Sequence, residues 1–136
     1  IGCAFILSAC SSSKKTEATM VNPLAGVEWK LSSVKSPTSD DLIIPNGDKI
    51  PTISFDATKN TIAGFGGCNR LMGPYELKKN NSLKFGNIAS TMMMCIEHMN
   101  LEQAVTKALE NTTSYKLENN QLMLMQGTMV LATFSK

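Results

Sequence analysis

The amino-acid sequence predicts a mainly β domain of the α+β class, a curled antiparallel sheet or open barrel of about seven or eight short strands with one helix. Three observations predict this class. Short stretches of alternating apolar and polar residues follow one another closely along the chain. Residue pairs typical of tight turns, such as Asn80-Asn81 and Asn119-Asn120, separate several of them. A single stretch, from Met99 to Leu109, has the apolar spacing of an amphipathic helix.

The predicted strands are residues 28–34, 49–55, 61–65, 75–79, 82–85, 114–118, 121–125 and 128–134. In the first of them, Trp29 is expected to pack inward. The segment 36–48 is dense in Ser, Pro, Asp and Gly, so it is predicted to be mostly loop. Turn-forming residues at 56–60 make the second and third strands a hairpin.

Four glycines and the helix start complete the expected local structure. Gly64, Gly66, Gly67 and Gly73 fall within ten positions. Such density indicates close backbone approach or positive φ, and argues against a sheet interior. Asn100 is a candidate cap for the helix that follows it.

Length and charge exclude several classes of protein. The chain has 136 residues and a net charge of +2, which indicates one domain. Proteins that bind nucleic acid usually carry a cluster of basic residues, and this sequence has none. With one histidine, no cofactor motif and no pair of positioned carboxylates, the sequence predicts a protein that is not an enzyme and needs no cofactor.

The beginning of the chain predicts export and a lipid anchor. Residues 1–9 are uncharged and mostly apolar, as in the end of a signal peptide. Leu7-Ser8-Ala9-Cys10 resembles the bacterial lipobox, in which the cysteine receives acyl chains such as palmitate. We therefore expect Cys10 to be lipidated and residues 10–25 to be a flexible tether. Ser11 stands where an Asp would suggest retention at the inner membrane, so the expected location is the outer membrane, with the domain facing the periplasm or the surface.

An ordered set of residues then carries a resemblance to a known family. The set comprises Trp29, Leu31, Gly67, Cys68, Asn69, Gly73, Tyr75, Thr91, Met93 and Cys95. In this order the residues resemble the pattern of the META domain family, which includes the HslJ-type heat-inducible lipoproteins. The expected META domain is residues 26–136. One departure is Met94, where family members often have Ala.

The resemblance implies a compact antiparallel β fold with one helix, exported from the cytoplasm. It implies no agreed enzymatic reaction. Members are associated in general terms with stress response, drug tolerance, secretion or virulence, which is context and not mechanism.

Cys68 and Cys95 admit three interpretations. In an exported domain the two cysteines are expected to form a disulfide. A second interpretation is a Cu(I) site formed by Met94, Cys95, His98 and Met99, since thioether, thiolate and imidazole are soft ligands. Against it, Met93 and Cys95 facing inward, with Met92 and Met94 outward, would fit a strand end, and Met123, Met125 and Met129 are expected in the core. A third interpretation, a nucleophilic cysteine activated by His98, matches no known spacing.

Asn69 and Thr91 are expected to tie the two cysteine-bearing loops together without contacting a ligand. The leading functional hypothesis is a non-enzymatic, membrane-anchored lipoprotein that acts in envelope stress response or integrity by binding another envelope component. The alternative is a carrier of a small ligand or Cu(I) in the periplasm or at the cell surface.

Overall fold

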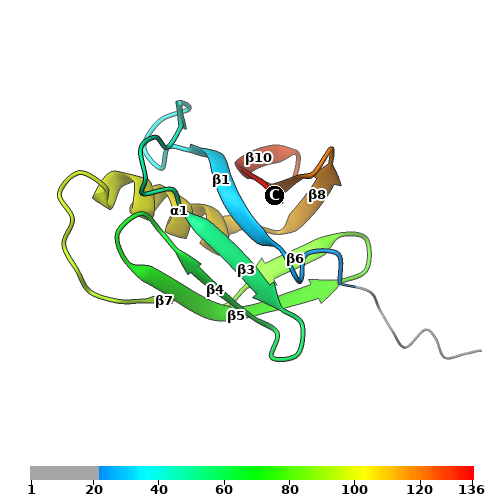
Figure 1. Ribbon diagram of the computed structural model, residues 1–136. Coiled ribbons are helices and arrows are strands. Elements are labelled where there is room, and N and C mark those ends of the chain that lie inside the picture. Colours follow the sequence, from blue (N-terminus) through cyan, green and yellow to red (C-terminus); the bar gives the residue numbers. More distant parts are fainter. Residues whose placement is uncertain (1–21) are drawn as a thin grey trace, which may run out of the picture.

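The computed structural model describes residues 22–136, in which ten strands form one antiparallel sheet beside one helix (Figure 1). The elements are β1 (Glu28–Lys35), β2 (Leu42–Ile43), β3 (Thr52–Asp56), β4 (Thr61–Phe65), β5 (Arg70–Lys78), β6 (Ser82–Phe85), β7 (Ala89–Ser90), α1 (Met99–Asn111), β8 (Ser114–Glu118), β9 (Gln121–Gln126) and β10 (Met129–Ser135). The predicted fold class is confirmed. The expected signal peptide, the expected lipidation of Cys10 and most of the expected tether concern residues outside those that the structure describes.

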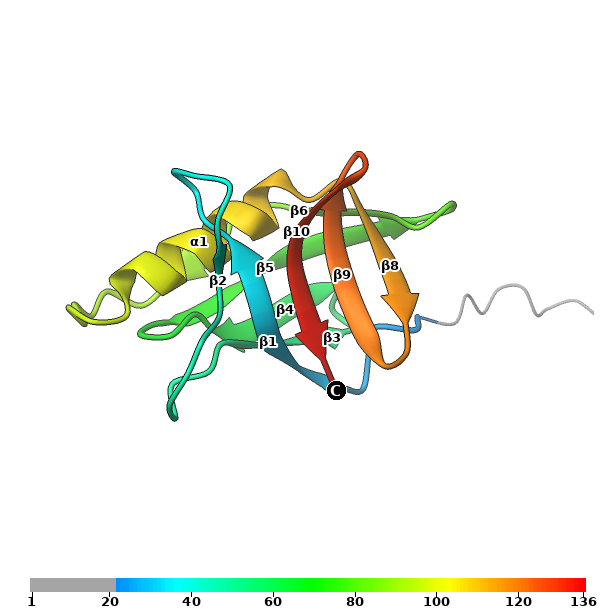
Figure 2. The same ribbon diagram turned by 90° about the horizontal axis from the view of Figure 1, so that it is seen from above.

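The sheet curls back on itself. Its order is β10-β9-β8-β6-β5-β4-β3-β1-β2, and β1 pairs with β10 as well as with β3. Figure 2 shows the resulting layout, with α1 lying along one side of the curled sheet. The join between β6 and β8 consists of one registered pair, Ser82 with Ser114, so the closure is not that of a regular barrel. Within the described part of the chain, the helix is too short and too polar to cross a membrane.

The core lies inside this curl and follows the alternation in the sequence. Trp29 and Leu31 of β1 are buried while their polar neighbours Glu28 and Lys30 are exposed. The helix contributes one apolar face to the same core. Its buried residues are Leu101, Glu102, Ala104, Val105, Ala108 and Leu109. Burial of one large apolar side chain stabilises a fold by about 1.5–3 kcal/mol, so this shared core holds helix and sheet together.

The domain begins earlier than the sequence indicated. Leu24 is fully buried, and its carbonyl oxygen accepts a hydrogen bond from the Trp29 indole N–H at 3.0 Å. Ala25 forms an isolated bridge with Phe55. Residues 22–25, which the sequence assigned to the tether, are therefore part of the domain.

Several expected positions of methionines are wrong. Residues 91–95 form no strand, and Met93, which was expected to face inward, is 57% exposed, whereas Met92 and Met94 point into solvent as expected. In β9 the fully buried positions are Leu122 and Leu124, while Met123 and Met125 alternate with them and are half-buried. Met129 is exposed at 42%. Alternation in β9 therefore directs leucines inward, and apolar character alone did not identify which set of residues faces the core.

Two of the glycines lie within strands, which was not expected, and the helix begins after a different residue than predicted. Gly64 and Gly73 lie inside β4 and β5, paired within the sheet, although close backbone approach explains both residues. A Cβ on Gly73 would lie 2.7 Å from the Asn87 carbonyl oxygen. The helix cap is His98, which makes no side-chain capping bond, and Asn100 lies within α1.

Candidate functional site

A disulfide joins the loop between β4 and β5 to the segment that precedes α1. It links Cys68 with Cys95, whose Cα atoms are 5.8 Å apart. The structure thus has the expected pairing of the two sulfurs. Neither sulfur is available as a thiolate while they are bonded, so a cysteine nucleophile beside His98 finds no support here.

Asn69 holds the same two segments together by hydrogen bonds. Its Oδ1 accepts from the Thr91 hydroxyl at 2.9 Å and from the Met93 backbone N–H at 2.6 Å. Its Nδ2 donates to the Met93 carbonyl oxygen at 3.1 Å. The Thr91 hydroxyl oxygen in turn accepts from the Arg70 N–H at 3.0 Å. Asn69 and Thr91 therefore connect the two loops, as the sequence indicated.

Glu102 adds further hydrogen bonds to the disulfide and the Asn69 contacts, and we call the whole arrangement the base. Reasoning from the sequence alone did not identify this role of Glu102. The residue lies in the first turn of α1 and is 6% exposed. Its carboxylate accepts the backbone N–H of Cys68 at 3.1 Å, the N–H of Asn69 at 2.5 Å and the Asn69 Nδ2 at 2.8 Å. Such bonds satisfy a buried carboxylate without a cation. Its position beside Leu101, on the apolar side of the helical spacing, was the signal that could have identified it.

The close fit of this base explains two glycines of the loop. A Cβ on Gly66 would lie 2.8 Å from the Glu102 Cγ, and Gly67 has a φ of 116°. Only glycine adopts such a φ without strain. The loop can therefore approach α1 closely enough for its N–H groups to reach the carboxylate.

The base presents an exposed apolar segment, Met92 to Ile96, which we call the Met loop. Exposed fractions are 91% for Met92, 57% for Met93, 81% for Met94 and 91% for Ile96. Single exposed apolar residues are common on protein surfaces, but a contiguous group of them indicates an interaction site. The hydrogen bonds and the disulfide fix the backbone, so the exposure of these side chains does not result from a loose segment.

Another exposed methionine lies on the outside of the sheet, next to the strand that leads to the Met loop. Met72, exposed at 57%, pairs with Ala89 of β7, and the chain passes from β7 directly into the Met loop. Both residues line a groove of about 680 Å³ on the outer side of β3, β4 and β5, with Pro74 among its other walls. In Figures 1 and 2 the segment between β7 and α1 and the start of the described chain lie at opposite ends of the molecule.

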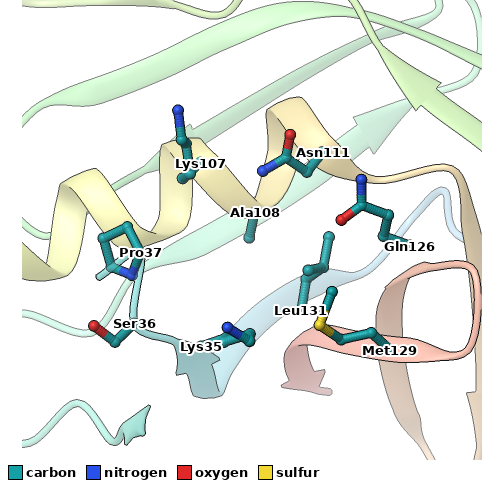
Figure 3. A pocket seen from close by; sticks show the side chains of 9 residues that line it. All are labelled: Lys35, Ser36, Pro37, Lys107, Ala108, Asn111, Gln126, Met129 and Leu131. Carbon is teal, nitrogen blue, oxygen red and sulfur yellow. The ribbon is translucent and has the colours of Figure 1, made fainter. Parts of the chain in front are cut away.

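A second groove lies between α1, β1 and β10 (Figure 3). Its volume of about 170 Å³ is below the roughly 300 Å³ at which small-molecule sites begin. Lys35 on its wall donates to the Ser39 carbonyl oxygen at 3.3 Å and lies 3.5 Å from the Asp40 carboxylate. In Figure 3 the Lys107 nitrogen points away from the groove. This groove therefore does not favour a carrier of organic ligands.

The remaining residues of the family motif contribute to the packing of the domain. Trp29 and Leu31 are buried, and Gly73 allows the close approach of the Asn87 backbone. The Tyr75 hydroxyl accepts from Asn22 Nδ2 at 2.7 Å and donates to the Asp56 carbonyl oxygen at 3.2 Å. Burial raises the pKa of Tyr75 above its usual value of 10.0.

The Cu(I) interpretation loses its strongest ligand. Cys95 is in the disulfide, which leaves Met94, His98 and Met99 without a thiolate. Residues 22–136 contain no group of three or more His, Cys, Asp or Glu side chains placed to hold a metal ion.

Comparison with known proteins connects this architecture to a family. The model of the META domain family matches residues 22–136. An NMR structure of a protein from Burkholderia xenovorans is 26% identical, with a TM-score of 0.62, over 91% of this chain and 97% of that one. A second NMR structure is 30% identical, with a TM-score of 0.62, over 85% and 95% of the two chains. A crystal structure of a DUF4847 family protein from Bacteroides vulgatus shares the fold at 17% identity, with a TM-score of 0.59 over 83% and 94%. No protein with a curated description matches the chain.

Proposed function

The chain belongs to the META domain family, and on this premise we propose that it is a non-enzymatic bacterial lipoprotein that binds a partner protein of the cell envelope through its Met loop. The proposed anchor is the acylated Cys10, and the proposed location is the outer membrane. Its role is support of the envelope under stress. The observation that carries the proposal is the rigid presentation of Met92, Met94 and Ile96 to solvent.

The construction of the base supports a binding role for the Met loop. A disulfide, the Asn69 bonds and a buried carboxylate hold a few residues that contribute little to the core. A surface ordered before binding loses less conformational entropy when a partner docks. Methionine also adapts its shape to an apolar partner surface, because its side chain is unbranched and polarisable.

The lack of positive charge in the Met loop favours a protein, and not a lipid surface, as its binding partner. Segments that bind anionic lipids carry clusters of Lys or Arg next to their apolar residues. The stretch from Thr91 to His98 contains Glu97 and no Lys or Arg, and the hydrogen bond from Arg70 to Thr91 uses the Arg70 backbone N–H and not its guanidinium. The anchor would hold the other end of the domain, since the described chain starts opposite the Met loop (Figure 2).

The anchoring part is tested by mass spectrometry of the mature protein purified from its native host. We expect a chain that begins at Cys10 and carries acyl groups. An unmodified Cys10 with residues 1–9 still attached would contradict the anchor and the proposed location.

The binding part is tested by photocrosslinking in the native envelope. A photoreactive side chain is placed at Met92 or Met94, and a matched one at Gln121, which is exposed in β9. We expect one abundant partner protein from the Met loop positions and not from Gln121. Its purified form should bind the wild-type domain and lose affinity for the Met92→Ser/Met94→Ser variant. Equal crosslinking from all positions, or crosslinking to lipid only, would contradict binding to a protein.

A further inference from the structure

Among the described residues, the Met loop also holds the most accessible reduced sulfur. Cys68 and Cys95 are the cysteines of residues 22–136, and both are already oxidised in the disulfide. The thioethers of methionine are then the sulfur atoms that remain open to oxidation. Their accessibility differs widely, from 91% exposure at Met92 to half-buried side chains at Met123 and Met125.

We propose that Met92, Met93 and Met94 form an oxidant-accepting site, whose conversion to methionine sulfoxide turns the Met loop from apolar to polar. The substrates are two-electron oxidants, namely hydroperoxides and hypochlorous acid. The regulatory consequence rests on the proposed function, because it concerns the affinity of the Met loop for its partner. The oxidation itself does not depend on any partner.

The reaction is a simple oxygen transfer. With hydrogen peroxide, a lone pair of the thioether sulfur attacks one peroxide oxygen and the O–O bond breaks. The other oxygen leaves as water after proton transfer, so sulfur is oxidised by two electrons and peroxide is reduced. The product is a polar, chiral sulfoxide, which methionine sulfoxide reductases return to the thioether.

The structure indicates that oxidation of the Met loop would not disturb the fold. The bonds that hold the Met loop use the backbone of Met93 and not its sulfur, since Asn69 contacts the Met93 N–H and carbonyl oxygen. The side chains of Met92 and Met94 are solvated, so an added oxygen requires no space in the core. In β9, by contrast, Met123 and Met125 are half-buried and alternate with the buried Leu122 and Leu124. Three adjacent sulfoxides would therefore change the polarity of the surface and leave the sheet intact.

The test treats purified protein with limiting hydrogen peroxide and follows each methionine by peptide mapping with tandem mass spectrometry. We expect Met92 and Met94 to be oxidised several-fold faster than Met123 and Met125, with no change in the thermal unfolding temperature. Methionine sulfoxide reductase should restore the original mass. Equal rates at all four positions, or unfolding as soon as the Met loop is modified, would overturn the proposal.

The matched control is the Met92→Leu/Met94→Leu variant, which keeps the size and apolar character of the side chains but cannot form sulfoxide. Treatment of the domain with peroxide before mixing should weaken its binding to the purified partner for the wild type and leave that of the variant unchanged. If oxidation is selective but binding to the purified partner does not respond, the regulatory consequence is wrong. If the untreated protein captures no partner, the proposed function fails, while the order of oxidation is measured independently.

Discussion

At the scale of single residues, one carboxylate organises the base of the Met loop. Glu102 accepts two backbone N–H groups and one side-chain amide from Cys68 and Asn69. Its place near the start of α1 is also favourable, because helix N-termini carry partial positive charge. The chemistry of Asn69 and the cysteines was predictable from residue type. Glu102 was not, because an acidic residue in the first turn of a helix is typically solvated.

Replacement of Glu102 should destabilise the domain in a graded way. Glu102→Ala leaves buried N–H groups without partners, which costs about 1–3 kcal/mol. Glu102→Gln should cost less, since an amide oxygen can still accept the backbone N–H groups while its NH2 faces the Asn69 amide donor. Urea unfolding measures both, with Gln103→Ala on the exposed side of α1 as the control. Equal effects of the Ala and Gln variants would show that the carboxylate is not the organising group.

Two tyrosines should make the domain sensitive to alkaline pH. Burial raises the pKa of both Tyr75 and Tyr115 above the usual value of 10.0. The folded state therefore favours the neutral phenol, so this contribution to stability is complete below pH 10 and is lost as pH rises through the raised pKa. Unfolding free energy should fall more steeply above pH 10 for the wild type than for Tyr75→Phe/Tyr115→Phe. Phenolate absorbance gives the titration directly, and a midpoint at or below 10.0 in folded protein would contradict it.

At the scale of elements, alternation predicted the strands whose two faces differ. The strands that end at Phe65 and Phe85 begin and end where the sequence placed them. Two-residue strands such as β2 and β7 carry too few residues for a periodic pattern, and pairing with a neighbour alone defines them. The start of β5 was missed for a similar reason, because Gly73 and Pro74 are typical of turns. There, contact with β4 overrides local preference.

Close strand approach makes Gly64 a sensitive position within β4. A Cβ there would collide with the carbonyl oxygen of Thr52 in the neighbouring strand β3. A backbone atom in a paired strand cannot move aside, so we expect Gly64→Ala to cost about 1–3 kcal/mol. Ala63→Ser, at the exposed adjacent position of the same strand, is the control and should be nearly neutral. Denaturant unfolding measures the free energy of unfolding of both variants. If Gly64→Ala left it unchanged, β3 and β4 could move apart at this position without loss of stability.

At the scale of the whole molecule, the first and last strands close the fold. β1 and β10 come from opposite ends of the domain and pair along the curl, so folding joins distant segments. Pairing of this kind loses loop-closure entropy before contacts compensate for it. The disulfide, with a sequence separation of 27, lowers the entropy of the unfolded chain by an amount equivalent to about 3.5 kcal/mol. Such long-range closure was not predictable, because no local pattern encodes which strands become neighbours.

The same topology predicts where the molecule opens first. β9 and β10 share six registered pairs, whereas β6 and β8 share one. Across that join, the Leu83 N–H donates to the Thr113 carbonyl oxygen at 3.1 Å and the Tyr115 N–H donates to the Asn81 carbonyl oxygen at 3.0 Å. Because few bonds must break together there, these two amides should exchange with solvent through local opening.

Native-state hydrogen exchange followed by NMR measures this directly. We expect the free energy of opening at Leu83 and Tyr115 to lie below that at Leu122 and Phe134, which face each other in β9 and β10. Low concentrations of denaturant should hardly change the free energy of opening at Leu83 and Tyr115. They should lower that at Leu122 and Phe134 in proportion to the decrease in the free energy of global unfolding. If all four amides exchanged only through global unfolding, the curled sheet would behave as one cooperative ring. In that case the packing of α1 against β6 would have to hold β6 and β8 together, because the backbone hydrogen bonds between these two strands are too few to do it alone.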